Sequence, residues 1–340
     1  MNHLKIGVIG VGRMGQHHCR VYSSLRQVQL VGVYDIDLQV GLDISKRYDI
    51  PAFNQLDELL EQVDAVSIAS PTPTHFDLVM RCLDRGIHVL VEKPLTDSLA
   101  QAEHLIRAAD QSGLVIQVGH IERFNPPYQE LKNVLENMDV LAVNFRRLSP
   151  FQGSNTDVDV ILDLMVHDLD LSLDLMKREP DLVSAYGLMP MSASLDHVVA
   201  ELWYQQGQLI TLTASRITEQ KVRSVEVTTK EAYLEVDLLH KAILVHRRST
   251  GEYSDQNHGG VKYRQESIIE RILVPAAEPL MLEVQHFLQC IDQNCPPRVT
   301  LEDGYKSLRL ALLIRNIVTE HNFHLTAQLK NEYIDHNPVL

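Results

Sequence analysis

Hydrophobic and polar positions follow two different patterns along the chain, and the change comes near residue 120. From residue 4 to about residue 119, short β-rich apolar runs alternate with amphipathic stretches of helical length, as in successive βαβ units. The predicted strands are Leu4–Ile9, Val28–Tyr34, Ala65–Ala69, His88–Val91 and Val115–Val118. The predicted helices are Arg13–Leu25, Leu38–Tyr48, Thr74–Arg85 and Ser98–Gln111. This α/β pattern predicts one doubly wound parallel sheet with helices on both faces.

After Gly119 the pattern predicts an α+β region with a large, open, mostly antiparallel sheet. We expect a helix near Pro126–Asn137, a strand over Val140–Leu148, a long helix over Val160–Met176, and then several strands with few helices between them. Residues 198–205 alternate clearly between an apolar face and a mixed face that carries Trp203. The apolar face requires helices of its own, whereas the mixed face is equally consistent with exposure to water and with a subunit interface.

Length and composition support two domains and exclude some partners. A chain of 340 residues is longer than a single hydrophobic core usually organises, so we expect two domains. The first, over residues 1–120, is the α/β domain, and the second, over residues 121–340, is a substrate-binding and oligomerisation domain. The formal charge of -14 disfavours nucleic acid as a partner. Apolar segments are far shorter than the about 20 residues that span a bilayer. The four cysteines lack the spacing of metal sites, so we expect reduced thiols, no metal and a cytoplasmic location.

A glycine-rich turn follows the first predicted strand and opens the first predicted helix. The turn reads Gly10-Val11-Gly12-Arg13-Met14-Gly15, and the second strand ends near Asp35, 20 residues past Gly15. Glycines at this spacing allow close approach to a pyrophosphate at a helix N-terminus, and the later carboxylate accepts from ribose hydroxyls. The sequence therefore predicts a Rossmann domain that binds NAD. Asp35 would repel a 2′-phosphate, which disfavours NADP.

Two further groups of residues are candidates for the chemistry. Glu92-Lys93-Pro94 follows a predicted strand at the sheet edge where such folds bind ligands, although a solvated lysine in a loop is an equally good interpretation. Asp163 and His167 have the i, i+4 spacing that places both on one helix face. Taken alone, this pair is better explained as part of a polar stripe, because Asp168 and Asp170 add further acidic residues here. An imidazole titrates near pH 6.5 and is the natural proton acceptor of the set.

The order of these motifs resembles the Gfo/Idh/MocA family of sugar and polyol oxidoreductases, over nearly the whole chain. The elements that carry the resemblance are the glycine turn, the acidic strand end, Ser70-Pro71-Thr72-Pro73-Thr74-His75, Glu92-Lys93-Pro94 and Asp163-x-x-x-His167. The resemblance implies that Lys93, Asp163 and His167 are catalytic and face the substrate beside the nicotinamide. It implies cofactor contacts from Gly10, Gly12, Arg13, Met14, Gly15, Asp35, Ser70, Thr72, His75, Glu92 and Lys93.

The stretch from Gly119 to Pro126 resembles that of family members that oxidise C3 of UDP-linked N-acetylhexosamines. It implies that the substrate is UDP-N-acetylglucosamine, bound partly by Arg123 and Asn125, and that a separate aminotransferase consumes the keto product for lipid A synthesis. It also fits a hinge whose Arg123 and Asn125 only satisfy backbone groups. Other basic residues eligible to meet a pyrophosphate are Arg146, Arg147, Arg216 and Arg223. We further expect a homodimer or homotetramer.

Two other functions stay open at this point. One is an inositol or free-sugar dehydrogenase of the same family, which would not require a nucleotide on its substrate. The other is a non-catalytic NAD(H)-binding regulator, because a fold alone does not imply activity. A regulator would need only the glycine turn and Asp35, so the additional presence of Lys93, Asp163 and His167 favours an enzyme.

Overall fold

A computed structural model describes residues 3–153, 158–255 and 260–336, with the backbone alone for residues 248–255, 260–267 and 322–336. The chain divides into two compact units. The first comprises residues 1–124 and 277–309, and the second comprises residues 125–276 and 310–340. The predicted domains differ from these units, because residues 277–309 pack with the first unit and it extends to Phe124.

The first unit is built on a six-stranded sheet in the order β3-β2-β1-β4-β5-β6, and every pairing in it is parallel. Its strands are β1 (Leu4–Ile9), β2 (Val28–Tyr34), β3 (Ala52–Phe53), β4 (Ala65–Ile68), β5 (His88–Glu92) and β6 (Ile116–Gly119). Its helices are α1 (Arg13–Ser24), α2 (Leu38–Tyr48), α3 (Leu56–Leu60), α4 (His75–Leu83), α5 (Leu99–Ser112) and α8 (Pro279–Gln293), with short 3-10 turns at Thr72–Thr74 and Ile121–Phe124. This strand order confirms the predicted Rossmann architecture.

In such a sheet, ligands bind beyond the carboxyl ends of the strands, where the chain order reverses. Here the reversal falls between β1 and β4, which are paired neighbours. The glycine turn follows β1, and Ser70 follows β4. The fold therefore brings these two loops together at the predicted cofactor edge.

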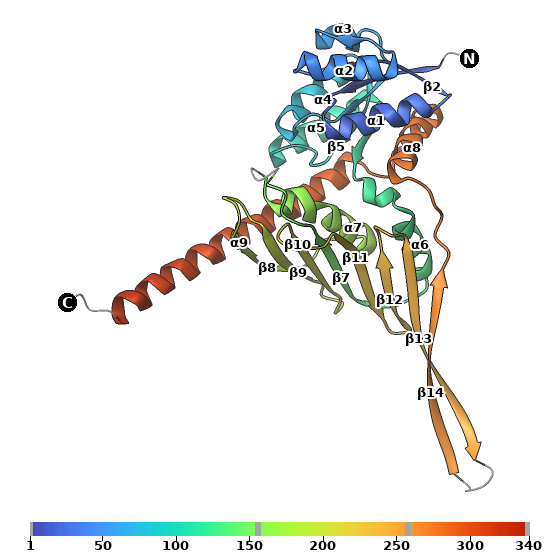
Figure 1. Ribbon diagram of the computed structural model, residues 1–340, viewed down its shortest axis with the longest axis vertical. Helices are drawn as coiled ribbons and strands as arrows, with labels where there is room; N and C mark the ends of the chain where they lie inside the picture. Colours follow the sequence, from blue (N-terminus) through green and yellow to red (C-terminus); the bar gives the residue numbers. More distant parts are fainter. Residues whose placement is uncertain (1–2, 154–157, 256–259, 337–340) are drawn as a thin grey trace. The chain divides into compact units, whose positions relative to one another are not determined.

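The second unit is built on an eight-stranded sheet in the order β14-β13-β12-β11-β7-β10-β9-β8. All its pairings are antiparallel except β10 with β7, which confirms the predicted open and mostly antiparallel sheet. Its strands are β7 (Val140–Leu148), β8 (Leu182–Leu188), β9 (His197–Trp203), β10 (Leu209–Ser215), β11 (Val222–Thr229), β12 (Ala232–Asp237), β13 (Ala242–Asp255) and β14 (Gly260–Ile272). Figure 1 shows β13 and β14 continuing together beyond the other strands.

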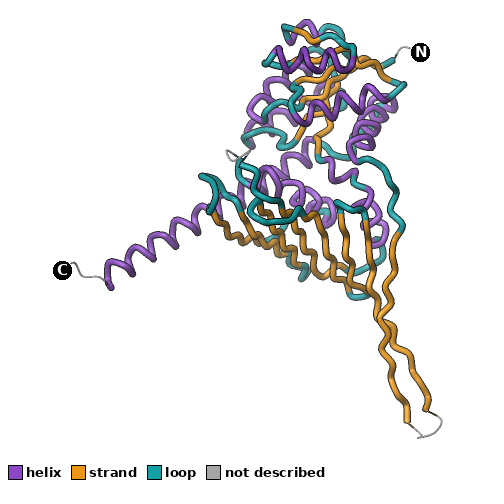
Figure 2. Tube along the Cα trace, in the orientation of Figure 1, coloured by secondary structure: helices purple, strands orange, loops and turns teal. Residues whose placement is uncertain are grey.

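Helices cover one face of this sheet, as the tube in Figure 2 also shows. They are α6 (Pro126–Leu135), α7 (Val166–Met176) and the part of α9 (Leu301–His336) that begins at Leu310. Side chains from all three helices join the inward face of the strands in one core. The predicted alternation along β9 is confirmed, because Val198, Ala200 and Leu202 are buried while Trp203 is 47% exposed.

The long helix predicted over Val160–Met176 is wrong at its first turn. Residues Ile161–Met165 form a π-helical turn, and only from Val166 is the helix α-helical. The start of this turn is fixed by contacts with other residues, because the Asp159 carboxylate accepts hydrogen bonds from the backbone N–H groups of Ile161 and Leu162, both at 2.9 Å. π-Helical turns are rare and often occur at functional sites.

Candidate active site

The glycine turn has the shape of a phosphate cradle. Gly10 has a φ of +79°, and a Cβ atom there would lie 2.6 Å from the Cα of Ser70. A Cβ at Gly15 would collide with the carbonyl oxygen of Gly10. At Gly12, by contrast, a Cβ would meet nothing within 4 Å. Gly10 and Gly15 are therefore required by the chain itself, whereas the open space beside Gly12 is available to a ligand.

The N-terminus of α1 lies at the same turn. Gly12 is its N-cap residue and no side chain caps the helix. Unpaired N–H groups and the positive end of the helix dipole favour a phosphate at such a position. The turn fits the pyrophosphate of a dinucleotide.

Asp35 is positioned for the ribose of that dinucleotide. Its Oδ2 accepts from Val11 N at 2.7 Å and its Oδ1 accepts from Asp37 N at 2.9 Å, which ties the carboxylate to the glycine turn. Each carboxylate oxygen keeps a second lone pair for a hydroxyl donor. The next side chain, Ile36, is 95% exposed and offers an apolar surface beside the carboxylate. These residues fit NAD better than NADP, whose 2′-phosphate would meet a negative charge.

The Glu92-Lys93-Pro94 segment lies at the carboxyl end of β5. Lys93 is partly exposed, and its peptide bond to Pro94 is cis. Glu92 is buried and its Oε1 lies 3.0 Å from Nε2 of His18. Burial by itself raises the pKa of Glu92, but the hydrogen bond from His18 and the charges of His18, Lys93 and His75 together hold it below its ordinary value. The segment therefore carries a buried anion directly beside Lys93.

His75 connects the loops that follow β4 and β5. Its Nε2 lies 2.9 Å from the carbonyl oxygen of Ser70, and its Nδ1 lies 3.0 Å from that of Pro94. The side chain is buried, and burial lowers its pKa. His75 thus fixes the shape of both loops from within. A direct contact of His75 with the cofactor stays a prediction, as it does for Ser70 and Thr72.

In the second unit, Asp163 lies in the π-helical turn and His167 in the first turn of α7. Both are partly exposed, whereas Ile161 and Met165 are buried. Beside His167, the Asp168 carboxylate forms a two-pronged ion pair with Arg147, at 2.6 and 2.9 Å. This buried pair holds the start of α7 against β7. It therefore stabilises the segment of chain that carries Asp163 and His167.

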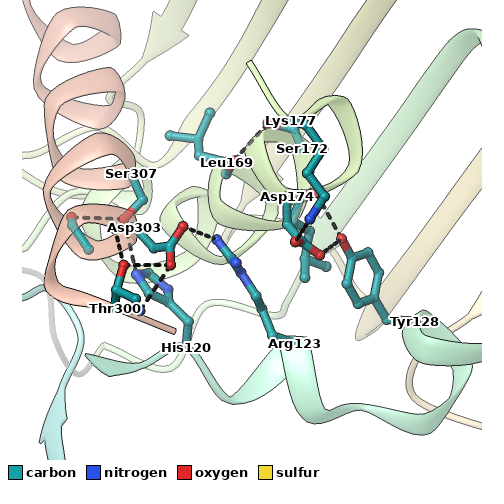
Figure 3. Close-up of polar contacts among 12 residues, drawn as sticks. His120, Arg123, Tyr128, Leu169, Ser172, Asp174, Lys177, Thr300, Asp303 and Ser307 are labelled. Carbon is teal, nitrogen blue, oxygen red and sulfur yellow. Dashed lines mark hydrogen bonds and ion pairs between the residues drawn. The ribbon is translucent and has the colours of Figure 1, made fainter. Parts of the chain in front are cut away.

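The stretch from Gly119 to Pro126 makes specific internal contacts. In the first unit, His120 Nε2 lies 3.0 Å from the Ser307 hydroxyl, and Arg123, only 5% exposed, pairs with Asp303 at 3.3 Å (Figure 3). In the second unit, Asn125 Nδ2 donates to the Leu238 carbonyl at 3.2 Å. Asn125 thus donates to a backbone group, as the hinge interpretation expects, whereas Arg123 pairs with a side-chain carboxylate, which that interpretation does not include. Substrate binding by Arg123 and Asn125 stays a prediction.

The other basic residues considered for a pyrophosphate differ in accessibility. Arg147 and Arg216 are buried and paired with Asp168 and Asp196, respectively. Arg223 is partly buried and donates to the Leu148 carbonyl at 2.7 Å. Arg146 is exposed. Among the described residues, no cluster of three or more His, Cys, Asp or Glu side chains could hold a metal ion, and no helix is long and apolar enough to cross a membrane.

Sequence reasoning missed His18, Gly119 and Asp159. A histidine on the apolar face of the helix that follows a glycine turn is a visible signal, but its partner Glu92 is 74 residues away in the chain. The sequence carries no signal that Gly119 lies against Glu92, although a Cβ there would lie 3.1 Å from the Glu92 carboxylate. His18 and Gly119 contact Glu92, which precedes Lys93, whereas Asp159 caps the turn that carries Asp163.

Family models match both units of this chain. Residues 4–120 match the NAD-binding Rossmann-fold model of the GFO/IDH/MocA oxidoreductase family, and residues 145–320 match its C-terminal alpha/beta domain. The chain belongs to this family. As a member of the GFO/IDH/MocA family, it is an NAD-type oxidoreductase by descent, and its Rossmann unit has the glycine turn and carboxylate that the cofactor requires.

Relatives within the family are named as enzymes that act on different substrates. The chain is 33% identical to UDP-N-acetylglucosamine 3-dehydrogenase from Acidithiobacillus ferrooxidans, over 93% of this chain and 97% of that protein. A solved structure of that enzyme superposes with a TM-score of 0.84, covering 94% of this chain and 98% of that one. The chain is also 26% identical to myo-inositol 2-dehydrogenase from Thermotoga maritima, over 93% and 97% of the respective chains.

Proposed function

We propose that this protein oxidises the C3 hydroxyl of UDP-N-acetylglucosamine with NAD, giving the UDP-3-keto sugar. The observation that carries the proposal is the 33% identity, across nearly the whole of both chains, with a relative of that name. The structural likeness to the same relative supports it. The glycine turn, Asp35, Lys93, Asp163 and His167 supply the polar groups that the reaction needs.

In this proposal NAD would accept the hydride. Residues of the chain accept the proton of the sugar hydroxyl and stabilise the negative charge that develops on its oxygen. His167 takes the proton of the sugar hydroxyl, because an imidazole exchanges protons near neutral pH without a large change of pKa. Lys93 stays an ammonium ion that holds the hydroxyl and stabilises the negative charge developing on its oxygen. Asp163 orients His167 or a neighbouring sugar hydroxyl.

The charge beside Lys93 is consistent with this division of roles. A lysine starts near pH 10.4 and would have to shift by roughly 3 pH units to act as a base at neutral pH. The buried Glu92 carboxylate adjoins Lys93 and favours the charged ammonium form. Lys93 is therefore the cation and His167 the base.

The finer setting of the enzyme is also part of the proposal. A keto sugar is a substrate for an aminotransferase, so we place the enzyme before one, in the synthesis of a diamino sugar for lipid A in the cytoplasm. We propose a homodimer or homotetramer formed through the mixed face of the eight-stranded sheet, where Trp203 and Tyr186 are exposed on neighbouring strands.

A second candidate, inositol oxidation, is favoured by the relative from Thermotoga maritima. A thermal-shift experiment in the presence of NADH separates the two functions. UDP-N-acetylglucosamine should raise the melting temperature at concentrations where myo-inositol and free N-acetylglucosamine do not. Stabilisation by myo-inositol with no response to the nucleotide sugar would support the second candidate instead.

A further inference from the structure

The guanidinium of Arg216 is buried in the second unit, directly after β10. Its Nη2 donates to the carbonyl oxygen of Val158 at 2.7 Å and to that of Leu195 at 2.9 Å. The hydroxyl of Ser194 lies 3.0 Å from the same nitrogen. Arg216 therefore joins the segment before the π-helical turn to the loop between β8 and β9.

Asp196 supplies the negative charge that allows this cation to be buried. Its side chain is 0% exposed, and its Oδ1 lies 3.2 Å from Nε of Arg216. Its Oδ2 accepts from the backbone N of Met191 at 2.8 Å and of Ser192 at 3.0 Å. The backbone adds a second connection, because Arg216 N donates to the Asp196 carbonyl at 2.9 Å. A buried charge is retained when it is both paired and hydrogen-bonded, so these contacts hold the guanidinium in one position.

One acceptor is shared by Arg216 and the π-helical turn. The Leu195 carbonyl accepts from Nη2 of Arg216 and also from Val160 N, at 3.0 Å. Val160 is the N-cap residue of the turn. The turn closes with Val166 N donating to the carbonyl of Ile161, five residues earlier. The contacts of Arg216 thus determine where the turn begins.

Asp163 is the candidate site residue in this turn, whereas His167 lies in the first turn of α7. The start of α7 is held by Arg147 through its ion pair with Asp168. The segment before the π-helical turn is held by Arg216. Each of the two candidates is therefore supported by a buried arginine of its own.

We propose that Arg216 is a positioning residue for the dehydrogenase reaction: through the carbonyls of Val158 and Leu195 it fixes the π-helical turn and so places the carboxylate of Asp163. The role of Asp163 in orienting His167 or a sugar hydroxyl belongs to the proposed function, on which this inference rests. The order of the turn, however, is a property of the second unit alone. It can be measured without cofactor or sugar.

Hydrogen exchange followed by mass spectrometry tests the structural step in the cofactor-free protein. Arg216→Leu removes the donor to Val158 and Leu195, so the amides of residues 161–166 should exchange about 10-fold faster. Arg216→Lys keeps a cation with N–H donors and should restore most of the protection. Since Arg216→Leu leaves the buried Asp196 without its counter-charge, the double variant Arg216→Leu with Asp196→Asn is measured as well. It should show the same faster exchange even if the single variant folds poorly.

Asp174→Asn is the matched control, because Asp174 is a buried carboxylate near the other end of α7. Asp174 accepts from the Tyr128 hydroxyl at 2.6 Å and pairs with Lys177 at 2.6 Å (Figure 3). Removing its charge should lower the stability of the second unit. The exchange of residues 161–166 should nevertheless stay as in the unaltered protein, because hydrogen exchange reports local opening.

Turnover supplies the second readout. With whichever sugar the enzyme oxidises, Arg216→Leu should lower kcat about 10- to 100-fold, because a small misplacement of a catalytic group has effects of this size. The Kd for NADH should change little, since the glycine turn and Asp35 belong to the first unit. Arg216→Lys should recover most of the kcat, and Asp174→Asn should keep all of it. Adding Arg216→Leu to Asp163→Asn should cause little further loss, because Arg216 acts through Asp163.

The outcomes distinguish this inference from the proposed function. Unchanged exchange in Arg216→Leu, an equal loss of kcat in Asp174→Asn, or additive losses when Arg216→Leu is combined with Asp163→Asn would overturn the positioning role. Failure to oxidise UDP-N-acetylglucosamine, with another sugar oxidised normally, would contradict the proposed substrate and leave the exchange result intact.

Discussion

The guanidinium of Arg123 lies 3.3 Å from the carboxylate of Asp303, and this pair joins the Gly119 to Pro126 stretch to the first turn of α9 within the first unit. Asp303 also accepts from the backbone N and the hydroxyl of Thr300, at 2.9 and 2.8 Å. Burial raises the pKa of Asp303, but the charge of Arg123 and the bonds from Thr300 lower it overall. The chain itself thus supplies a charged partner and two further hydrogen-bond donors for this carboxylate.

This pair predicts how stability depends on acid. Because the native pKa of Asp303 lies below its unfolded value near 3.9, its contribution is present above about pH 4 and is lost as the pH falls through the native pKa. Asp303→Asn should cost about 2 kcal/mol at pH 7, and the difference from the unaltered protein should narrow below pH 4. Urea unfolding at several pH values measures this. The exposed pair of Asp139 and Lys230 is the control, and Asp139→Asn should change little.

The glycine turn predicts two different outcomes for one kind of substitution. Gly10→Ala places a methyl group against Ser70 at a positive φ and should destabilise the fold by at least about 1 kcal/mol. Gly12→Ala meets no atom of the chain, so it should melt normally and yet weaken NADH binding at least about 10-fold. Calorimetry and fluorescence titration measure the two effects. Normal NADH affinity in Gly12→Ala would contradict a pyrophosphate at this turn.

Cofactor choice should depend on Asp35. The unaltered protein should bind NADH far more tightly than NADPH, because the carboxylate accepts from ribose hydroxyls and repels a 2′-phosphate. Asp35→Ser should narrow this preference by removing the charge. Equal affinities in the unaltered protein, measured by titration, are incompatible with the proposed cofactor.

Substitution of the proposed catalytic residues Lys93, Asp163 and His167 should lower the turnover rate more than the affinity for the cofactor. Lys93→Met and His167→Asn should each lower hydride transfer at least about 100-fold while NADH binding stays nearly intact, because neither residue belongs to the pyrophosphate turn. Single-turnover kinetics across a range of pH measures the effect. If His167→Asn keeps its full rate at every pH, the base is another group.

The sequence predicted elements best where local periodicity determines them. The bounds of Leu4–Ile9, Val28–Tyr34 and Val140–Leu148 agree with the structure to the residue. The two-residue strand Ala52–Phe53 is too short for a periodic pattern and is recognised only by its pairing with β2. The π-helical turn depends on the Asp159 carboxylate and on Val160 N donating to the Leu195 carbonyl, 35 residues away. The Asp159 contacts are local, as in a helix N-cap, but the contact with Leu195 is absent from any local pattern.

In the candidate site, too, features set by local sequence could be predicted and features set by long-range contacts could not. The glycine turn and Asp35 could be predicted because strand, turn and helix follow one another within 32 residues. Arg123 and Asp303 are 180 residues apart, so the resemblance implied a substrate-binding cation at a position where the structure has a buried, paired one. The contact of His18 with Glu92 was missed for the same reason.

The most direct test of the account is a trapped reaction. Oxidation of C3 by NAD is uphill, so purified protein is mixed with NAD, UDP-N-acetylglucosamine and an aminotransferase with an amino donor that removes the keto product. We predict that mass spectrometry detects the UDP-diamino sugar, that its formation requires Lys93 and His167, and that free N-acetylglucosamine reacts far more slowly because it lacks the binding energy of the UDP group. Absence of that product, together with ready reduction of NAD by myo-inositol or an unlinked sugar, would contradict the proposed substrate.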